Sequence, residues 1–178
     1  SAEVHRADRI PEFLNRAFKV AATPPTGPLY LSLPSNLLGD TIEVKNPAAE
    51  RSQVRPRIGA DPESIEEAAK MLADAKRPLI VAGSGIAKAG GTGGLIKFAE
   101  LLGAPVVMEP RYSFLSFPTD HPQSFQIAER NPAFGLPVWG EPDVILAIGC
   151  RLIREYRYLP EPVIKPGTRC IHIEEDPW

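Results

Sequence analysis

The sequence predicts an α/β fold: an open, doubly wound parallel sheet, preceded by a helix and a strand left over from another α/β domain. From residue 61 onward, short apolar runs alternate with amphipathic helical runs, which is the pattern of βαβ units. Parallel strands joined in this way require right-handed crossovers. Before this unit, residues 39–59 form a linker of about 20 charged, proline-containing residues without periodicity, longer than most loops inside a domain.

The first part of the chain predicts one helix and one strand. Residues 9–22 form the helix, because Pro11 suits a first turn and apolar residues recur at helical spacing. The proline-rich segment 23–28 ends it, and residues 29–33 follow as a strand. A single helix and strand cannot bury their own apolar faces. We therefore expect residues 1–38 to be the C-terminal tail of a separate domain.

The second unit opens with a capped helix that leads into a buried strand. Asp61 can cap this helix, and Pro62 suits its first position. Residues 78–82 form a short, wholly apolar strand of the kind found inside a parallel sheet. A second helix is predicted over 92–102, and Gly103 suits the left-handed residue that ends it.

Three more strands follow this helix. They are predicted at residues 105–108, 143–148 and 169–173, each an apolar run bounded by turn residues. The stretch 109–142 between the first two contains several prolines and aromatic residues, and only residues 123–130 of it read as a short helix.

Composition narrows the class of protein. The net charge of −2, with both signs dispersed, gives no reason to expect a nucleic acid or an acidic membrane as partner. No apolar run approaches the roughly 20 residues of a membrane helix, and no signal peptide is visible. Cys150 and Cys170 lie in or beside apolar runs, so two buried reduced thiols in a cytoplasmic protein are expected, with a disulfide as the alternative.

One candidate binding site consists of residues that follow the predicted strands. Gly83 and Gly85 directly follow the first strand, where glycines let a backbone approach a phosphate. The dinucleotide pattern is incomplete because Lys88 stands where the third glycine belongs, and a tight turn without a ligand is the alternative. Arg151 and Asp176 follow later strands, at the edge where open sheets bind ligands. If a nucleotide binds, these four residues are predicted to hold it.

The histidines give no catalytic assignment. His121 beside Asp120 has the composition of a base with its orienting acid, but adjacent residues rarely point at one place, and prolines on both sides indicate a rigid loop. His172 lies inside a predicted strand and is expected to face outward or to bond to a neighbour. The sequence contains no serine elbow, paired-carboxylate site, metal cluster or Walker loop, so no catalytic or metal-binding residue is predicted.

In chain order, these runs resemble thiamine-diphosphate-dependent enzymes of the acetolactate synthase and benzoylformate decarboxylase type. Residues 27–34 (GPLYLSLP) resemble the last strand of their pyrimidine-binding domain, and residues 75–85 (AKRPLIVAGSG) the start of their Rossmann-like central domain. The remaining matches, in the order of the family, are residues 100–107, 117–122, 143–149 and 165–173 with Asp176 and Pro177. The resemblance assigns 1–38 to the first domain, 39–59 to a linker and 60–178 to a central domain that continues past this chain.

Two branches of this family differ in whether the central domain binds FAD. The acetolactate synthase branch binds it, and the benzoylformate decarboxylase branch does not. Residues 117–122 and 154–160 look more like the decarboxylase. Residues 126–134 lack the glycine- and histidine-containing FAD loop of the synthase, and Leu152 and Ile153 stand where the synthase has aspartates. These departures argue against binding of FAD by this chain.

The resemblance also implies what the parent enzyme does. Such enzymes cleave or form a C–C bond next to a 2-keto acid carbonyl, with thiamine diphosphate as the electron sink. Their activating glutamate would lie before Ser1, and their Mg²⁺-binding motif beyond Trp178. The chain alone is therefore expected to be inactive and to space the pyrimidine- and diphosphate-binding domains of a dimeric or tetrameric parent. Alternatives are a module that binds FAD or ADP, and a scaffold domain with an empty crevice.

Overall fold

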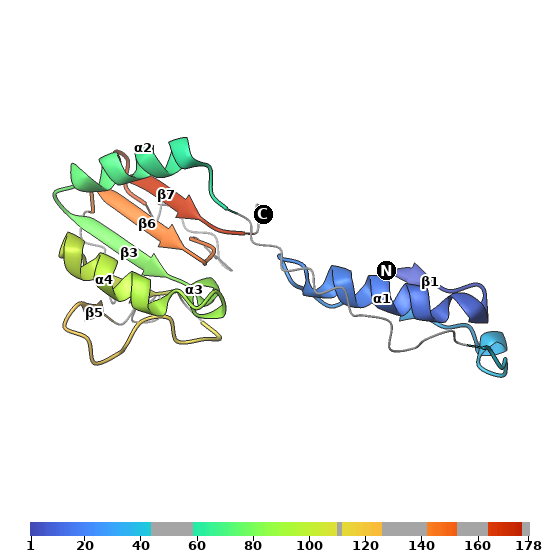
Figure 1. Cartoon of the computed structure of the whole chain (residues 1–178). Coiled ribbons are helices and arrows are strands. Elements are labelled where there is room, and N and C mark those ends of the chain that lie inside the picture. The colour runs from blue at the N-terminus through green and yellow to red at the C-terminus, as the bar shows by residue number, and fades with distance from the viewer. Residues whose placement is uncertain (44–58, 110–111, 126–141, 153–163, 176–178) are drawn as a thin grey trace. The chain divides into compact units, whose positions relative to one another are not determined.

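The computed structural model describes residues 1–43, 59–109, 112–125, 142–152 and 164–175. The chain divides into two compact units, Ser1–Gly59 and Ala60–Pro177, and each is considered by itself (Figure 1).

The first unit is small, and its described residues form one α-helix and a pair of very short strands. Strand β1 (Ala2–Glu3) pairs in parallel with β2 (Leu31–Ser32). Between them lie the 3-10 turn η1 (Ala7–Arg9) and helix α1 (Ile10–Ala22), and a second 3-10 turn, η2 (Ser35–Leu37), follows. The predicted helix is confirmed, while the predicted strand is reduced to two residues. Strand β1 was not predicted, because two residues are too few to show a period.

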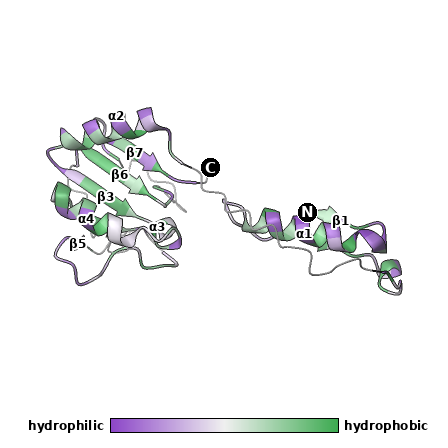
Figure 2. Cartoon of the chain, viewed as in Figure 1, coloured by the Kyte–Doolittle hydropathy of each residue, from purple (hydrophilic) through white to green (hydrophobic). Residues whose placement is uncertain are grey.

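Helix α1 leaves apolar side chains uncovered. None of its residues is buried, and the exposed fraction of Phe18 is 73%. Leu14 and Val20 of the same helix are also exposed, and Figure 2 shows hydrophobic segments along α1. Leu14 and Phe18 are four residues apart and so share one side of the helix, and exposed apolar side chains placed together in this way are typical of a face that contacts another part of a protein.

The second unit is built on a parallel sheet, as predicted, but β5 joins the four predicted strands, so the sheet has five. The strand order is β5-β4-β3-β6-β7. The chain enters at the central strand β3, extends the sheet to one side with β4 and β5, and then returns to add β6 and β7 on the other side. The direction of winding therefore changes between β3 and β6, which is where open sheets bind ligands. The strands are β3 (Pro78–Ala82), β4 (Val106–Met108), β5 (Ser124–Phe125), β6 (Val144–Ile148) and β7 (Arg169–Ile173).

The described residues of this unit form three helices: α2 (Pro62–Ala73), α3 (Ser84–Lys88) and α4 (Thr92–Leu102). The caps of α2 and α4 are those predicted. The Asp61 carboxylate accepts a 2.8 Å hydrogen bond from the Ser64 amide at the start of α2. Gly103 ends α4 with a left-handed φ of 62°.

Side chains of the central strands alternate between two cores, as the period of a strand requires. On one face, Ile80 and Leu146 pack with residues of all three helices, including Leu72, Ile86 and Leu95. The opposite face of the sheet carries a second core. Its buried residues are Leu79, Val81, Val107, Ile145, Ala147 and Cys150, with Leu152 and Ile164 packed against them.

The short helix predicted over residues 123–130 is wrong where the structure can be compared. Ser124–Phe125 form the edge strand β5 instead, and residues 126–130 lie outside the described part of the chain. The Val106 amide of β4 donates a 2.8 Å hydrogen bond to the Gln123 carbonyl. Pairing with the open edge of β4 therefore prevails over the weak local preference for a helix.

Candidate functional site

The candidate site lies at the carboxyl edge of the sheet, between β3 and β6. The turns that follow these strands are in direct backbone contact. The Gly83 amide donates to the Ile148 carbonyl at 2.8 Å, and the Gly85 amide donates to the Gly149 carbonyl at 2.9 Å. The structure therefore places the predicted Gly83 and Gly85 at the switch point of the sheet.

The two glycines face the chain's own backbone. A Cβ atom built on Gly83 would overlap the Gly149 carbonyl oxygen and the Cys150 Cβ. A Cβ on Gly85 would lie 2.7 Å from the Gly149 Cα, well inside ordinary contact distance. Gly149 itself has a left-handed φ of 61°. The requirement for glycine thus follows from the close approach of the two turns.

Glu109, which directly follows β4, reaches the start of helix α3. Its Oε1 accepts a 2.7 Å hydrogen bond from the Ser84 amide. The Ser84 hydroxyl in turn accepts hydrogen bonds from the amides of Ser113 and Phe114, at 2.9 and 3.3 Å. The segment after β4 is thereby bound to the turn after β3.

Ser116 adds a second, fully buried connection between these segments. Its hydroxyl donates to the Gly83 carbonyl at 2.6 Å and accepts from the Ala87 amide at 3.2 Å. Glu109, Ser84 and Ser116 were not predicted from the sequence as site residues. For Glu109 a signal existed, because it is an acid at the end of a strand, the criterion that selected Asp176. No comparable signal marked Ser84 or Ser116.

Cys150 is a buried thiol at the same edge. Burial, followed by the negative charges of Glu109 and Glu174, raises its pKa to about 12. Such a thiol remains protonated and is a poor nucleophile. The backbone carbonyl oxygen of Cys150 lies 2.7 Å from His172 Nε2, so the expectation that His172 bonds to a neighbour is confirmed.

The cysteine prediction is confirmed for Cys150 and wrong for Cys170. Both thiols are free, but Cys170 is exposed. It lies on β7, which borders the described sheet on one side. Burial requires covered faces and neighbouring strands, and an apolar run does not report whether a strand is central or at an edge.

Arg151 and Asp176 complete the predicted nucleotide site. Arg151 is exposed and follows β6 by three residues, and Asp176 lies outside the described residues. The assignment of Gly83, Gly85, Arg151 and Asp176 to a nucleotide therefore remains a prediction. The segments 126–134 and 154–160, which separated the two branches of the family, also lie outside the described residues.

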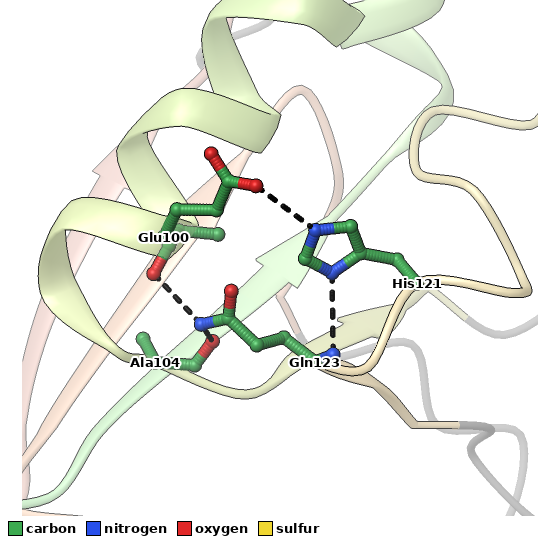
Figure 3. Close-up of polar contacts among 5 residues, drawn as sticks. Glu100, Ala104, His121 and Gln123 are labelled. Carbon is green, nitrogen blue, oxygen red and sulfur yellow. Dashed lines mark hydrogen bonds and ion pairs between the residues drawn. The ribbon is translucent and has the colours of Figure 1, made fainter.

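His121 holds its loop against helix α4 (Figure 3). Its Nδ1 accepts a 3.2 Å hydrogen bond from the Gln123 amide, and its Nε2 lies 3.5 Å from Glu100 Oε1. Because Nδ1 is an acceptor, a neutral ring carries its proton on Nε2 and directs it at Glu100. The Gln123 side chain donates to the carbonyls of Ala99 and Ala104, both at 2.8 Å. These contacts give His121 a structural role in joining the loop to the helix.

Among the described residues, no group of three or more histidine, cysteine, aspartate or glutamate side chains is arranged to hold a metal ion. In the same part of the chain, no helix combines the length and the hydropathy needed to span a membrane.

A parallel sheet that starts at its central strand, with helices packed on it and a glycine turn at the switch point, defines a Rossmann-like α/β domain. Residues 65–178 match the family described as thiamine pyrophosphate enzyme, central domain. The chain belongs to this family.

Relatives that the chain resembles bear the names of different enzymes. A probable acetolactate synthase large subunit from Methanocaldococcus jannaschii is 29% identical, over 98% of this chain and 30% of that protein. A benzoylformate decarboxylase from Pseudomonas aeruginosa is 26% identical, over 96% of this chain and 32% of that protein.

Solved structures agree with the fold. The thiamine diphosphate-dependent 4-hydroxybenzoylformate decarboxylase of Rhodococcus jostii RHA1 superimposes with a TM-score of 0.84 at 27% identity, over 99% of this chain and 33% of that one. The benzoylformate decarboxylase of Polynucleobacter necessarius gives a TM-score of 0.82 at 30% identity, with 99% and 33% covered. The chain spans about a third of the length of these relatives.

Proposed function

We propose that this chain is part of a longer thiamine-diphosphate-dependent enzyme that decarboxylates 2-keto acids or joins them to a second carbonyl compound. Within that enzyme, the chain has a structural role and spaces the domains that bind the cofactor. The observation that carries this proposal is the match of residues 65–178 to the central domain, in a chain that spans about a third of its relatives. We also place the enzyme in the cytoplasm, which agrees with two free cysteines.

When bound in the complete enzyme, thiamine diphosphate would supply the electron sink for breaking or forming the bond next to the keto group. The described residues do not offer a donor set for Mg²⁺ and a diphosphate, because they form no cluster of potential metal ligands. At the glycine turn, the amides already bond to groups of the chain itself. We assign binding of the cofactor and Mg²⁺ to the pyrimidine- and diphosphate-binding domains of the same protein.

The proposed domain limits are 1–38 for the tail of the pyrimidine-binding domain, 39–59 for the linker and 60–178 for the central domain. The uncovered apolar side chains of α1 support the first limit, since the body of a preceding domain would cover them. We further propose that the parent assembles into a dimer or a tetramer.

The test is an activity assay on the complete gene product that contains this chain. With thiamine diphosphate and Mg²⁺, we expect release of CO₂ or formation of a carboligation product from pyruvate or benzoylformate. The 178-residue chain, assayed in parallel, is expected to show neither. Absence of turnover with any 2-keto acid by the complete protein would refute the proposed activity, and activity of the short chain would refute its structural role.

A further inference from the structure

The amides of the turn after β3 all bond to acceptors within the chain. In a loop that binds phosphate, such amides point at the ligand and are otherwise unpaired. Here one of the acceptors is a carboxylate, and the other four are three carbonyls and a hydroxyl. The pairs are Gly83 with the Ile148 carbonyl, Ser84 with the Glu109 carboxylate, Gly85 with the Gly149 carbonyl, Ile86 with the Gly83 carbonyl and Ala87 with the Ser116 hydroxyl.

The space that a phosphate would need is also filled. In a phosphate-binding turn, glycines lack a Cβ so that the ligand can approach the backbone. The missing Cβ atoms of Gly83 and Gly85 instead face Gly149 and Cys150 of the neighbouring turn. The two turns are joined by a 2.9 Å hydrogen bond from Gly85 to Gly149, so the side of these two glycines that lacks a Cβ faces the chain's own backbone.

Glu109 brings a negative charge to this turn. Its carboxylate accepts a hydrogen bond from the Ser84 amide, and the distance of 2.7 Å is that of a charge-assisted hydrogen bond. Glu109 and Glu174 both act on the thiol of Cys150, which places two negative charges close to this edge. A phosphate that approaches the edge would meet repulsion as well as occupied donors.

We propose that Glu109 is an internal anion that takes the place of a nucleotide phosphate at the β3 turn and excludes FAD and ADP from this domain. The glycine turn then serves as a closed junction between β3, β6 and the segment after β4, in which the two serines complete the bonding. This assignment concerns residues within the chain and does not depend on the substrate of the parent enzyme.

The first measurement is ligand-induced thermal stabilisation of the 178-residue chain by ADP, FAD and inorganic pyrophosphate. We expect no saturable shift of the melting temperature Tm with any of them. A saturable upward shift with ADP or FAD in the unmodified chain would overturn the proposal, because a ligand that binds only the folded state must raise Tm.

The second measurement compares Glu109→Ala with Glu109→Gln, which keeps an acceptor of the same shape but loses the charge. Loss of the carboxylate leaves the Ser84 amide unpaired, and we expect Glu109→Ala to lower Tm by about 5 to 10 °C. Glu109→Gln should lower Tm by less. The matched control is Glu100→Ala, since Glu100 is exposed and its carboxylate lies 3.5 Å from His121 Nε2, a long contact whose loss should change Tm little.

Added formate distinguishes the charge of Glu109 from its bulk. Formate supplies a small carboxylate, so it should restore part of the Tm lost in Glu109→Ala and have no such effect on Glu100→Ala, measured against equal concentrations of chloride. Two results would each contradict an internal anion: a Glu109→Ala loss no larger than that of the control, or a loss that formate does not reduce.

Discussion

The closed junction between the two turns can be probed by adding a single methyl group at Gly83. The backbone of Gly83 is extended (φ −106°, ψ 172°), so alanine adopts it without strain. The added Cβ would overlap the Gly149 carbonyl oxygen and the Cys150 Cβ. Neither atom belongs to the flexible end of a side chain, and the Gly149 oxygen also accepts the hydrogen bond from Gly85. The cost of Gly83→Ala is therefore steric and requires the two turns to move apart.

Overpacking of a well-filled interior costs about 1–3 kcal/mol, and we expect Gly83→Ala to reach about 3 kcal/mol because backbone must shift. For a domain of this size, that loss corresponds to a fall in Tm of roughly 10 °C. Calorimetry of the 178-residue chain, together with urea unfolding followed by far-ultraviolet circular dichroism, measures both quantities.

The matched control is Gly94→Ala in helix α4. Gly94 is exposed, and a Cβ built on it meets no atom within 4 Å. Alanine in a helix is more stable than glycine by roughly 0.5–1 kcal/mol, so this variant should be slightly more stable than the unmodified chain. If both substitutions changed stability in the same direction, or if Gly83→Ala were neutral, the packing account of the junction would be refuted.

Three further predictions concern other parts of the chain. Hydrogen bonds from the amides of Lys76 and Arg77 lower the pKa of Asp143, so the contribution of Asp143 to stability is present above about pH 4 and is lost as the pH falls through the lowered pKa of the folded state. The difference in urea midpoint between the unmodified chain and Asp143→Ala should therefore shrink from pH 7 to pH 2. A difference that stayed constant with pH would contradict this prediction. Titration with a thiol reagent at pH 8 should modify the exposed Cys170 quickly and the buried Cys150 only after denaturation; fast modification of two thiols in the native chain would show that Cys150 is accessible. Phe18→Ser should leave the Tm of the 178-residue chain nearly unchanged, because Phe18 is 73% exposed there. The same substitution should destabilise the complete gene product, in which we expect a preceding domain to cover α1. Equal effects in both proteins would argue against such a covering domain.

The sequence predicts structure best where local chemistry determines it. The Asp61 cap, the Gly103 terminus and the apolar strand at residues 78–82 were all predicted and are all observed, because capping and period act between residues close in the chain. It fails at β5 and at Cys170, where the outcome depends on position within the sheet. Ser124–Phe125 become a strand only because the edge of β4 is available, and Cys170 is exposed because β7 borders the described sheet.

The candidate site shows the same division. The sequence by itself determined that glycines follow β3 and that parallel strands bring their carboxyl ends to one edge, since both follow from residue type and alternation. Only the tertiary structure decided what those glycines contact. The Glu109 carboxylate and the Ser84 amide are 25 residues apart, and the turn that closes on Gly83 and Gly85 belongs to a strand much later in the chain. A glycine in the sequence indicates only that another group approaches the backbone closely at that position. Packing between distant segments decides whether that group is a ligand phosphate or, as here, another turn of the same chain.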